Sequence, residues 1–318
     1  MCLTALATSL LLAGVTIVAL FYGVGGYFVD LALKRGTDSD PMAPPAVSAS
    51  LTEPRANKPD KPSVEAQAWE IRAQDGINLS ATCFIPWQAS AAGHQWVILL
   101  HGYGRSQEDT WDYAEAYLEH GYQVLTPDLR ASGHSQGQYV TMGTMEAEDV
   151  ALWVGRILSA DPKARVVLHG ISMGAATAMM TAGRGDMEGK VAAVVEDSGY
   201  TSADAMFAVK MEAFQLPVDI LLPVVTYMSE KRTGVSIERA SALQAVRRSK
   251  VPILFIHGTN DLLVPYSMMQ TLYAASASRN KEAWTVDGGR HAAAKHKNPE
   301  EYFHRVFSFA DKYTGNDR

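Results

Sequence analysis

The sequence has very little cysteine: two residues, Cys2 and Cys83, in a chain of 318. Cys2 lies in an apolar N-terminal run and Cys83 in a predicted strand, so the two are poorly placed to pair and no disulfide framework is expected. The C-x-x-C and H-E-x-x-H motifs are missing, and the nine histidines are not grouped at the spacings of metal ligands. We therefore expect neither a metal ion nor a cofactor.

An excess of charge of one sign is also missing. The 28 basic and 34 acidic residues are interspersed and leave a net charge of −6, which does not suggest a nucleic-acid partner. The apolar fraction of 47% is ordinary for a globular protein with a substantial core. A chain of this length can hold one large domain or two small ones.

The N-terminal stretch from Cys2 to Val29 contains no charged residue. It is long enough to cross a hydrocarbon layer of about 30 Å, which takes about 20 helical residues. Residues common at a membrane interface lie near its end: Tyr22, Tyr27, Asp30, Lys34 and Arg35. A cleaved signal peptide is the alternative, but no basic segment precedes the run, and the run exceeds a normal signal-peptide core. We predict a single-pass transmembrane anchor in the cell membrane over residues 1–35, with the side of the catalytic domain left open.

Residues 36–67 are rich in Pro, Ala, Ser, Asp and Lys without periodicity, which predicts a flexible linker. From residue 68, a hairpin around Asp75-Gly76 is followed by alternating strands and helices. The predicted strands are Trp96–Leu100, Gln123–Thr126, Arg165–His169, Val191–Glu196, Ile253–Ile256 and Ala283–Val286. The predicted helices are Glu108–Glu119, Thr144–Leu158, Gly174–Ala182, Ser267–Ala275 and Pro299–Tyr313. This alternation predicts an α/β fold over residues 68–318, with a mostly parallel central sheet and helices on both faces.

The alternation stops between about residues 200 and 250. This stretch is apolar, rich in methionine and broken by Pro217 and Pro223. Two ordinary packing helices are one interpretation. We favour a small helical cap over the site, whose apolar side chains line an acyl or aromatic pocket.

One strand-to-helix junction carries the strongest chemical signal. Arg165–His169 is a β-branched apolar run, and the small residues of Gly174–Ala182 predict a helix. Between them, the G-x-S-x-G pattern of residues 170–174 places Ser172 on a tight turn, which is typical of a nucleophile elbow.

A second G-x-S-x-G pattern occupies residues 133–137 and contains Ser135. It follows a loop rather than a strand, and the residues after it are a poor start for a helix. We therefore favour Ser172 over Ser135 as the nucleophile.

A serine nucleophile needs a base, and the base needs a carboxylate that orients it. His291 lies in a glycine-rich loop after the last predicted strand, where its side chain can reach the carboxyl edge of a parallel sheet. Asp261 lies in the loop after the preceding strand. Asp197, at the end of an earlier strand, is the alternative acid, although it can also cap the helix that follows. We predict Ser172, Asp261 and His291 as the catalytic residues.

Two backbone N–H groups are predicted to bind the oxyanion: those of Met173 and Tyr103. Met173 follows the nucleophile at the start of a helix, and Tyr103 belongs to the loop after an early strand. His101, in the same loop, is expected to brace it rather than to take part in the chemistry.

Six motifs, in this order, resemble the α/β-hydrolase superfamily, in particular its bacterial membrane-anchored serine hydrolases of esterase-like activity. They are HGYG at 101–104, DLRASGHS at 128–135, GISMGA at 170–175, EDSGYTS at 196–202, HGTNDLLVP at 257–265 and GGRHA at 288–292. The chain order Ser172, Asp261, His291 is also that of the superfamily. One departure is Ala131, which stands where relatives commonly carry glycine and which bears on the conformation of its loop.

The resemblance implies hydrolysis of a carboxylic ester through an acyl-enzyme. Because the superfamily hosts many reactions, an acyl-thioesterase or a serine peptidase with the same triad is an alternative. A catalytically silent, membrane-tethered binding protein is another, although the complete triad argues against it. The shortness of the apolar insertion further predicts a preference for small or medium acyl groups over long-chain triglycerides.

Overall fold

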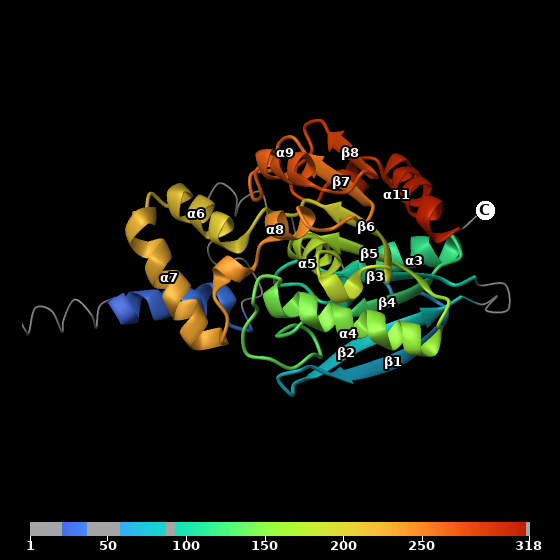
Figure 1. Ribbon diagram of the computed structural model, residues 1–318, viewed down its shortest axis with the longest axis horizontal. Helices are drawn as coiled ribbons and strands as arrows, with labels where there is room; N and C mark the ends of the chain where they lie inside the picture. Colours follow the sequence, from blue (N-terminus) through green and yellow to red (C-terminus); the bar gives the residue numbers. More distant parts are fainter. Residues whose placement is uncertain (1–20, 37–57, 87–92, 316–318) are drawn as a thin grey trace, which may run out of the picture.

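The computed structural model describes residues 21–36, 58–86 and 93–315. Within these residues, eight strands form one sheet in the order β1-β2-β4-β3-β5-β6-β7-β8, and only β2 runs against the others (Figure 1). The strands are β1 (Glu65–Arg72), β2 (Asn78–Ile85), β3 (Gln95–Leu100), β4 (Gln123–Pro127), β5 (Arg165–Ile171), β6 (Val191–Asp197), β7 (Ile253–Gly258) and β8 (Lys281–Val286).

Helices cover both faces of the sheet, which is why its central strands are apolar on both faces. The covering helices are α3 (Trp111–Glu119), α4 (Thr144–Ala160), α5 (Met173–Ala182), α8 (Ala242–Val246), α9 (Tyr266–Ala275), α10 (Ala294–Lys297) and α11 (Pro299–Thr314). In β3, Val97 and Leu99 belong to the buried cluster that α3 and α11 complete. Ile98 and Leu100 belong to the cluster on the opposite face, together with residues of α4, α5, α8 and α9. The predicted α/β architecture is therefore confirmed.

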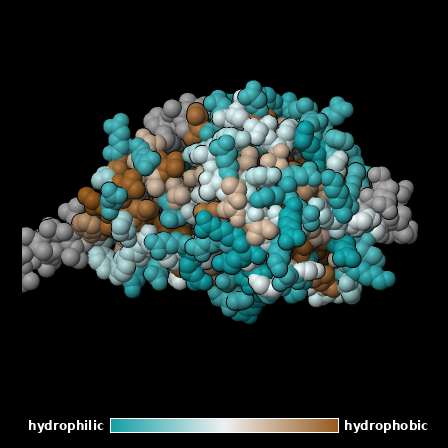
Figure 2. Space-filling model, turned by 45° about the horizontal axis from the view of Figure 1, so that its top comes forward, coloured by the Kyte–Doolittle hydropathy of each residue, from teal (hydrophilic) through white to brown (hydrophobic). Residues whose placement is uncertain are grey.

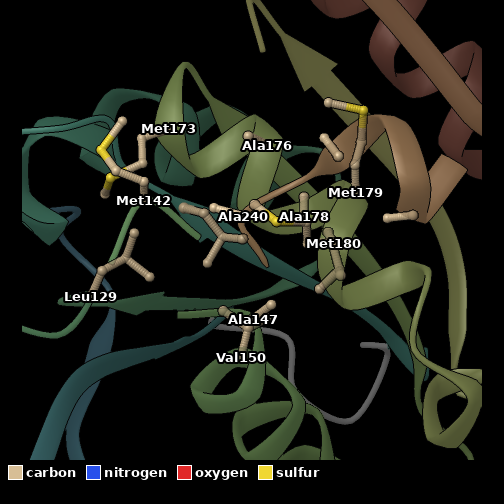
Figure 3. Packing of buried hydrophobic residues seen from close by; sticks show 14 of the residues in the cluster. Leu129, Met142, Ala147, Val150, Met173, Ala176, Ala178, Met179, Met180 and Ala240 are labelled. Carbon is tan, nitrogen blue, oxygen red and sulfur yellow. The ribbon is translucent and has the colours of Figure 1, made fainter. Parts of the chain in front are cut away.

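Helix α5 lies very close to the sheet because its first turn carries small residues. A Cβ added to Gly174 would lie 2.1 Å from the carbonyl oxygen of Leu100 in β3. Figure 3 shows Ala178 and Met180 of α5 on the side of the helix toward Ala147 and Val150 of α4, in a cluster that also contains other methionine side chains. This close packing fixes the start of α5 above the carboxyl edge of the sheet.

The predicted secondary structure agrees well with the observed elements. Each of the six predicted parallel strands is present and extends one or two residues further than predicted. The hairpin is also present, with β1 and β2 antiparallel and Gly76 at a φ of +88° in the turn. One helix differs: the helix predicted from Glu108 begins as a 3-10 turn, η1 (Gln107–Thr110), and α3 starts at Trp111.

The insertion after β6 holds α6 (Ala203–Ala213), α7 (Val218–Thr233) and then α8. Helices α6 and α7 project beyond the body of the domain as a pair, as expected of a cap (Figure 1). Helix α8 belongs to the layer on the sheet instead, because a Cβ added to Gly183 at the end of α5 would lie 2.6 Å from Cβ of Ala245. Helices α6 and α7 are thus the projecting part of the insertion, and its role as a cap stays a prediction.

The described part of the N-terminal apolar run packs onto the domain. Residues 21–33 form a helix, and Val29 and Leu33 at its end are buried in the larger core cluster. The Arg35 guanidinium donates hydrogen bonds of 2.6 Å to the carbonyl oxygens of Ser135 and Gly133. Residues 21–35, which belong to the predicted anchor, therefore pack against the predicted domain.

The predicted transmembrane helix is not found among the described residues, where no helix is both long enough and apolar enough to cross a membrane. Most of the predicted anchor, residues 1–20, lies outside them. Residues 37–57 of the predicted linker also lie outside, and β1 already begins at Glu65, before the predicted end of the linker at residue 67.

Candidate active site

Ser172 is the single residue between β5 and α5, and its backbone is strained. Its φ of +56° and ψ of −117° are rare for a residue with a side chain and persist only where the surroundings enforce them. A Cβ added to Gly170 would come within 2.1 Å of the carbonyl oxygen of Gly174, so both flanking glycines are required for the turn. The Ser172 N–H donates to the carbonyl oxygen of Asp197 at 2.8 Å, which ties the turn to the end of β6. The turn raises the partly exposed Ser172 to the carboxyl edge of the sheet.

The structure brings Ser172, His291 and Asp261 together through two hydrogen bonds. Nε2 of His291 lies 2.9 Å from Oγ of Ser172, and Nδ1 of His291 lies 2.7 Å from Oδ2 of Asp261. A carboxylate can only accept, so Nδ1 carries the hydrogen and Nε2 presents a lone pair to the serine hydroxyl. This is the arrangement of a nucleophile, a base and an orienting acid.

The Asp261 side chain is fully buried and accepts four hydrogen bonds. The N–H groups of Leu263 and Val264 both donate to Oδ1 at 2.9 Å, while Nδ1 of His291 and Nε2 of His257 approach Oδ2 at 2.7 and 3.1 Å. Burial alone would raise the pKa of Asp261, but the attraction of His291 and these hydrogen bonds outweigh it and lower the pKa below its usual range. Asp261 is therefore ionised at neutral pH.

We did not predict the contact of His257, which lies at the end of β7, with Asp261. Its Nε2 also faces the carbonyl oxygen of Val264 at 2.9 Å, and its Nδ1 has no partner among the described residues. Burial lowers the pKa of His257, but the hydrogen bond with Asp261 and the attraction of Glu196 raise it above its ordinary value. The motif HGTND held the signal, since a side chain at a strand end can face one four residues later in the loop.

Asp197, the alternative acid, contacts other groups. Its carboxylate accepts hydrogen bonds from the hydroxyls of Tyr302 at 2.9 Å and Ser198 at 2.8 Å. Burial raises the pKa of Asp197, and these hydrogen bonds only partly oppose the effect. The Ser198 hydroxyl also accepts from the N–H of Ala292 at 3.1 Å, next to His291. Asp197 thus supports the loop that carries His291 and is not the partner of its imidazole.

Ser135 has a structural role. Its hydroxyl is fully buried, donates to the carbonyl oxygen of Asp128 at 2.6 Å and accepts from the N–H of Ser80 at 2.9 Å. The Asp128 carboxylate in turn accepts from the N–H groups of Gln107 and His134, both at 2.8 Å. The second G-x-S-x-G pattern therefore belongs to a tightly bonded loop without a free nucleophile.

His101 braces its loop in the way predicted. Its Nε2 accepts from the N–H of Leu129 at 3.0 Å, so its Nδ1 carries the hydrogen and donates to the carbonyl oxygen of Gly102 at 2.8 Å. Burial lowers the pKa of His101, and the ring is neutral at pH 7.

The braced loop lies directly against the nucleophile. A Cβ added to Gly102 would lie 3.4 Å from Cβ of Ser172. Tyr103 is the next residue, and Met173 is the first residue of α5, whose first N–H groups have no acceptor within the helix. The oxyanion roles of the Tyr103 and Met173 N–H groups stay a prediction that these positions suit.

A polar cavity of about 250 Å³ lies beside the same loop. Lys34, Arg35 and Arg105 contribute positive charge to its lining, together with Tyr103 and Gly104. Its charge would suit an anionic group rather than a metal ion. Across residues 21–36, 58–86 and 93–315, no three His, Cys, Asp or Glu side chains gather as metal ligands.

Comparison with known proteins agrees with this geometry. A family model of the alpha/beta hydrolase fold matches residues 95–221, and a model of the serine aminopeptidases S33 matches residues 236–298, so the two matches together include Ser172, Asp261 and His291. The uncharacterized protein YqkD of Bacillus subtilis is 28% identical over 217 residues, which are 68% of this chain and 70% of YqkD. The uncharacterized protein YfhR of Escherichia coli K12 is 25% identical over 246 residues, which are 77% of this chain and 80% of YfhR. Among solved structures, the esterase Pf2001 of Pyrococcus furiosus superposes with a TM-score of 0.65 at 28% identity and covers 82% of this chain and 97% of its own.

Proposed function

We propose that this chain, which has the α/β-hydrolase fold, is a serine hydrolase that cleaves carboxylic esters of small or medium acyl groups. The observation that carries the proposal is the continuous hydrogen-bonded chain from Asp261 through His291 to Ser172. A serine hydroxyl on a strained turn, with an imidazole nitrogen in bonding distance, is an alcohol that can be deprotonated as it attacks.

The reaction would proceed in two stages. Ser172 Oγ attacks the ester carbonyl while Nε2 of His291 takes its proton, and Asp261 stabilises the imidazolium that forms. The N–H groups of Met173 and Tyr103 would bind the oxyanion, and the alcohol leaves with the proton from His291. A water molecule, activated by the same imidazole, then releases the acid from Ser172.

Two observations favour an ester as the substrate. The esterase Pf2001 covers most of this chain in three dimensions. Many side chains of α6 and α7 are apolar, and an apolar lining suits an acyl or aromatic group better than a charged one.

A serine peptidase is the second candidate, because the model of the serine aminopeptidases S33 matches residues 236–298, which carry Asp261 and His291. An acyl-thioesterase would use the same triad. We also propose that the uncharged N-terminal run holds the protein at the cell membrane, as its length and composition suggest.

The test is labelling of the purified full-length protein by a fluorophosphonate, which reacts covalently with an activated serine. We expect labelling and ester hydrolysis in the wild type and in Ser135→Ala, and loss of both in the folded Ser172→Ala, with hydrolysis down by several orders of magnitude. Labelling of folded Ser172→Ala would overturn the proposal.

A matched set of an ester, a thioester and an anilide with the same acyl group separates the three substrate classes. We expect the ester to have the highest kcat/KM relative to its spontaneous hydrolysis. A higher value for an aminoacyl anilide would favour the peptidase instead.

A further inference from the structure

Exposed apolar side chains gather at one end of the molecule. Of the seven large hydrophobic side chains that are exposed in the described residues, six lie on the N-terminal helix, at the end of α6 or on α7: Phe21, Tyr22, Tyr27, Phe214, Ile220 and Tyr227. Tyr27 and Ile220 are the most open of the six, at 64% and 56% exposure. Figure 2 shows the corresponding hydrophobic surface at the end of the molecule where the N-terminal helix and the cap lie. We call these six side chains the apolar end.

The apolar end is one packed unit rather than two loose segments. A Cβ added to Gly25 of the N-terminal helix would lie 2.5 Å from Cγ1 of Val224 and 2.9 Å from Cγ of Met228, so glycine lets this helix pack closely on α7. The hydroxyls of Tyr22 and Tyr227 lie 3.1 Å apart, and their rings meet edge to face with centroids 5.9 Å apart. The N-terminal helix and α7 therefore pack together at the apolar end.

The charges of α7 are confined to its two ends. From Ile220 to Ser229 the helix carries none, while Asp219 lies in its first turn and Glu230, Lys231 and Arg232 lie in its last. The Lys231 ammonium lies 5.3 Å from the centroid of the Tyr227 ring. Tyrosine and basic side chains that border an apolar stretch are typical of the boundary between lipid and water.

We propose that the apolar end docks on a lipid bilayer, with α7 and the end of α6 at the level of the lipid headgroups. The N-terminal helix is the end of an apolar run that has no charge from Cys2 to Val29, so the chain that leads into the patch suits lipid as well. A patch that served only to join two copies of the chain would not need so long an uncharged extension.

This placement would bring the mouth of the site to the membrane surface. Helix α6 follows β6 closely and so starts at the carboxyl edge of the sheet that carries Ser172. The N-terminal helix reaches the same edge, because the Tyr103 hydroxyl donates to the carbonyl oxygen of Ala32 at 2.6 Å. Docking does not depend on catalysis, because a catalytically silent protein would dock in the same way. The proposed hydrolase activity and the proposed membrane docking can therefore fail separately.

Docking is tested by fluorescence on the full-length chain in phosphatidylcholine vesicles. Cys2→Ser removes one native thiol and Cys83 is fully buried, so a single introduced cysteine can carry a polarity-sensitive dye. One dye is placed at Phe214→Cys on the apolar end. The control dye is placed at Glu115→Cys, an exposed position of α3, and α3 lies at the other end of the domain (Figure 1). We expect the dye at 214 to shift to shorter wavelength and to lose most of its emission when the vesicles contain spin-labelled phosphatidylcholine, and the dye at 115 to do neither.

The apolar contact itself is tested at the exposed Ile220. Ile220→Asp should abolish lipid quenching at position 214, and the matched Ile220→Val should preserve it, with both variants folded by circular dichroism. Equal quenching at 214 and 115, or quenching at 214 that Ile220→Asp leaves unchanged, would overturn docking. A second copy of the chain on the apolar end would give a different result. It would shield the dye at 214 from aqueous iodide without quenching by lipid, and dilution would remove this shielding. That outcome would also overturn membrane docking.

Discussion

Oδ2 of Asp261 is shared by two histidines: Nδ1 of His291 lies 2.7 Å from it, and Nε2 of His257 lies 3.1 Å from it on the buried side. The carboxylate is therefore fixed from behind by one imidazole while it orients the other. Because the side chain of His257 makes its polar contacts with Asp261 and Val264, the role expected of it is to position the carboxylate.

His257→Leu should lower kcat about tenfold with little change in KM, because the Asp261 carboxylate loses a donor that holds it in place. Steady-state kinetics on one ester check both parameters. In His257→Gln, whose amide can still donate, most of the turnover should return; an equal loss in Leu and Gln variants would count against positioning.

Asp261→Asn should reduce turnover by about 10⁴, because the amide cannot hold the imidazole with its lone pair toward the nucleophile. Asp197→Asn should keep turnover within about tenfold of the wild type while lowering the free energy of unfolding by about 1–3 kcal/mol, because an amide replaces an acceptor of two buried hydroxyls. Purified variants compared on one ester, with urea unfolding alongside, decide between them. A nearly inactive Asp197→Asn beside an active Asp261→Asn would reverse the assignment.

The strands of the sheet and the meeting of Ser172, His291 and Asp261 could be predicted from the sequence, because both depend on local patterns. A buried parallel strand needs a continuous apolar run, and a nucleophile elbow needs glycines on both sides of the serine, as Gly170 and Gly174 illustrate. The loops that carry Asp261 and His291 follow neighbouring strands β7 and β8, so their meeting at the carboxyl edge followed from strand order alone.

What could not be predicted depends on contacts between distant segments. An apolar helix suits a bilayer and a protein core equally well, so the sequence of residues 21–33 did not indicate that Val29 and Leu33 would be buried in the domain. The contact of Gly25 with Val224 on α7 could be recognised only in three dimensions. The second donor on Asp261 was missed because the spacing of four residues between His257 and Asp261 allows the contact but does not require it.

Ala131→Gly should stabilise the protein by about 0.5–1 kcal/mol. Ala131 has a φ of +58°, and this left-handed conformation costs alanine more than the extra chain entropy costs glycine. Urea unfolding measures the change. The matched Ala151→Gly within helix α4 should destabilise by about 1 kcal/mol, and equal destabilisation in both variants would contradict strain at Ala131.

Among p-nitrophenyl esters, activity should be highest for short or medium acyl chains and fall toward long ones. The cap consists of one pair of helices, α6 and α7, which is little cover for a long acyl chain. Initial rates are compared on monomeric substrates without vesicles, so that membrane binding does not change the substrate concentration. Rates that rise steadily to long chains, with activation by a triglyceride interface, would contradict this preference.

The last prediction concerns Glu196, which is fully buried on β6. Its Oε2 accepts the N–H of Gly199 at 2.8 Å, and its Oε1 has no partner within the described part of the chain. Burial raises the pKa of Glu196 to about 7, and the attraction of His257 opposes this only in part. In the unfolded chain the same carboxyl group titrates near pH ~4.3.

Between these two pKa values the folded protein holds a proton that the unfolded chain has released. The stabilising effect of this proton is fully present below about pH 4.3 and is lost as the pH rises through about 7, by an amount on the order of 3 kcal/mol. Glu196→Gln cannot ionise, so its free energy of unfolding should exceed that of the wild type at pH 8 by more than at pH 5. Urea unfolding at both pH values measures how much the difference between variant and wild type changes with pH. The control Glu212→Gln, at an exposed position of α6, should show no such change. The same difference at pH 5 and pH 8 would mean that Glu196 does not titrate in this window, because a change of packing alone is independent of pH.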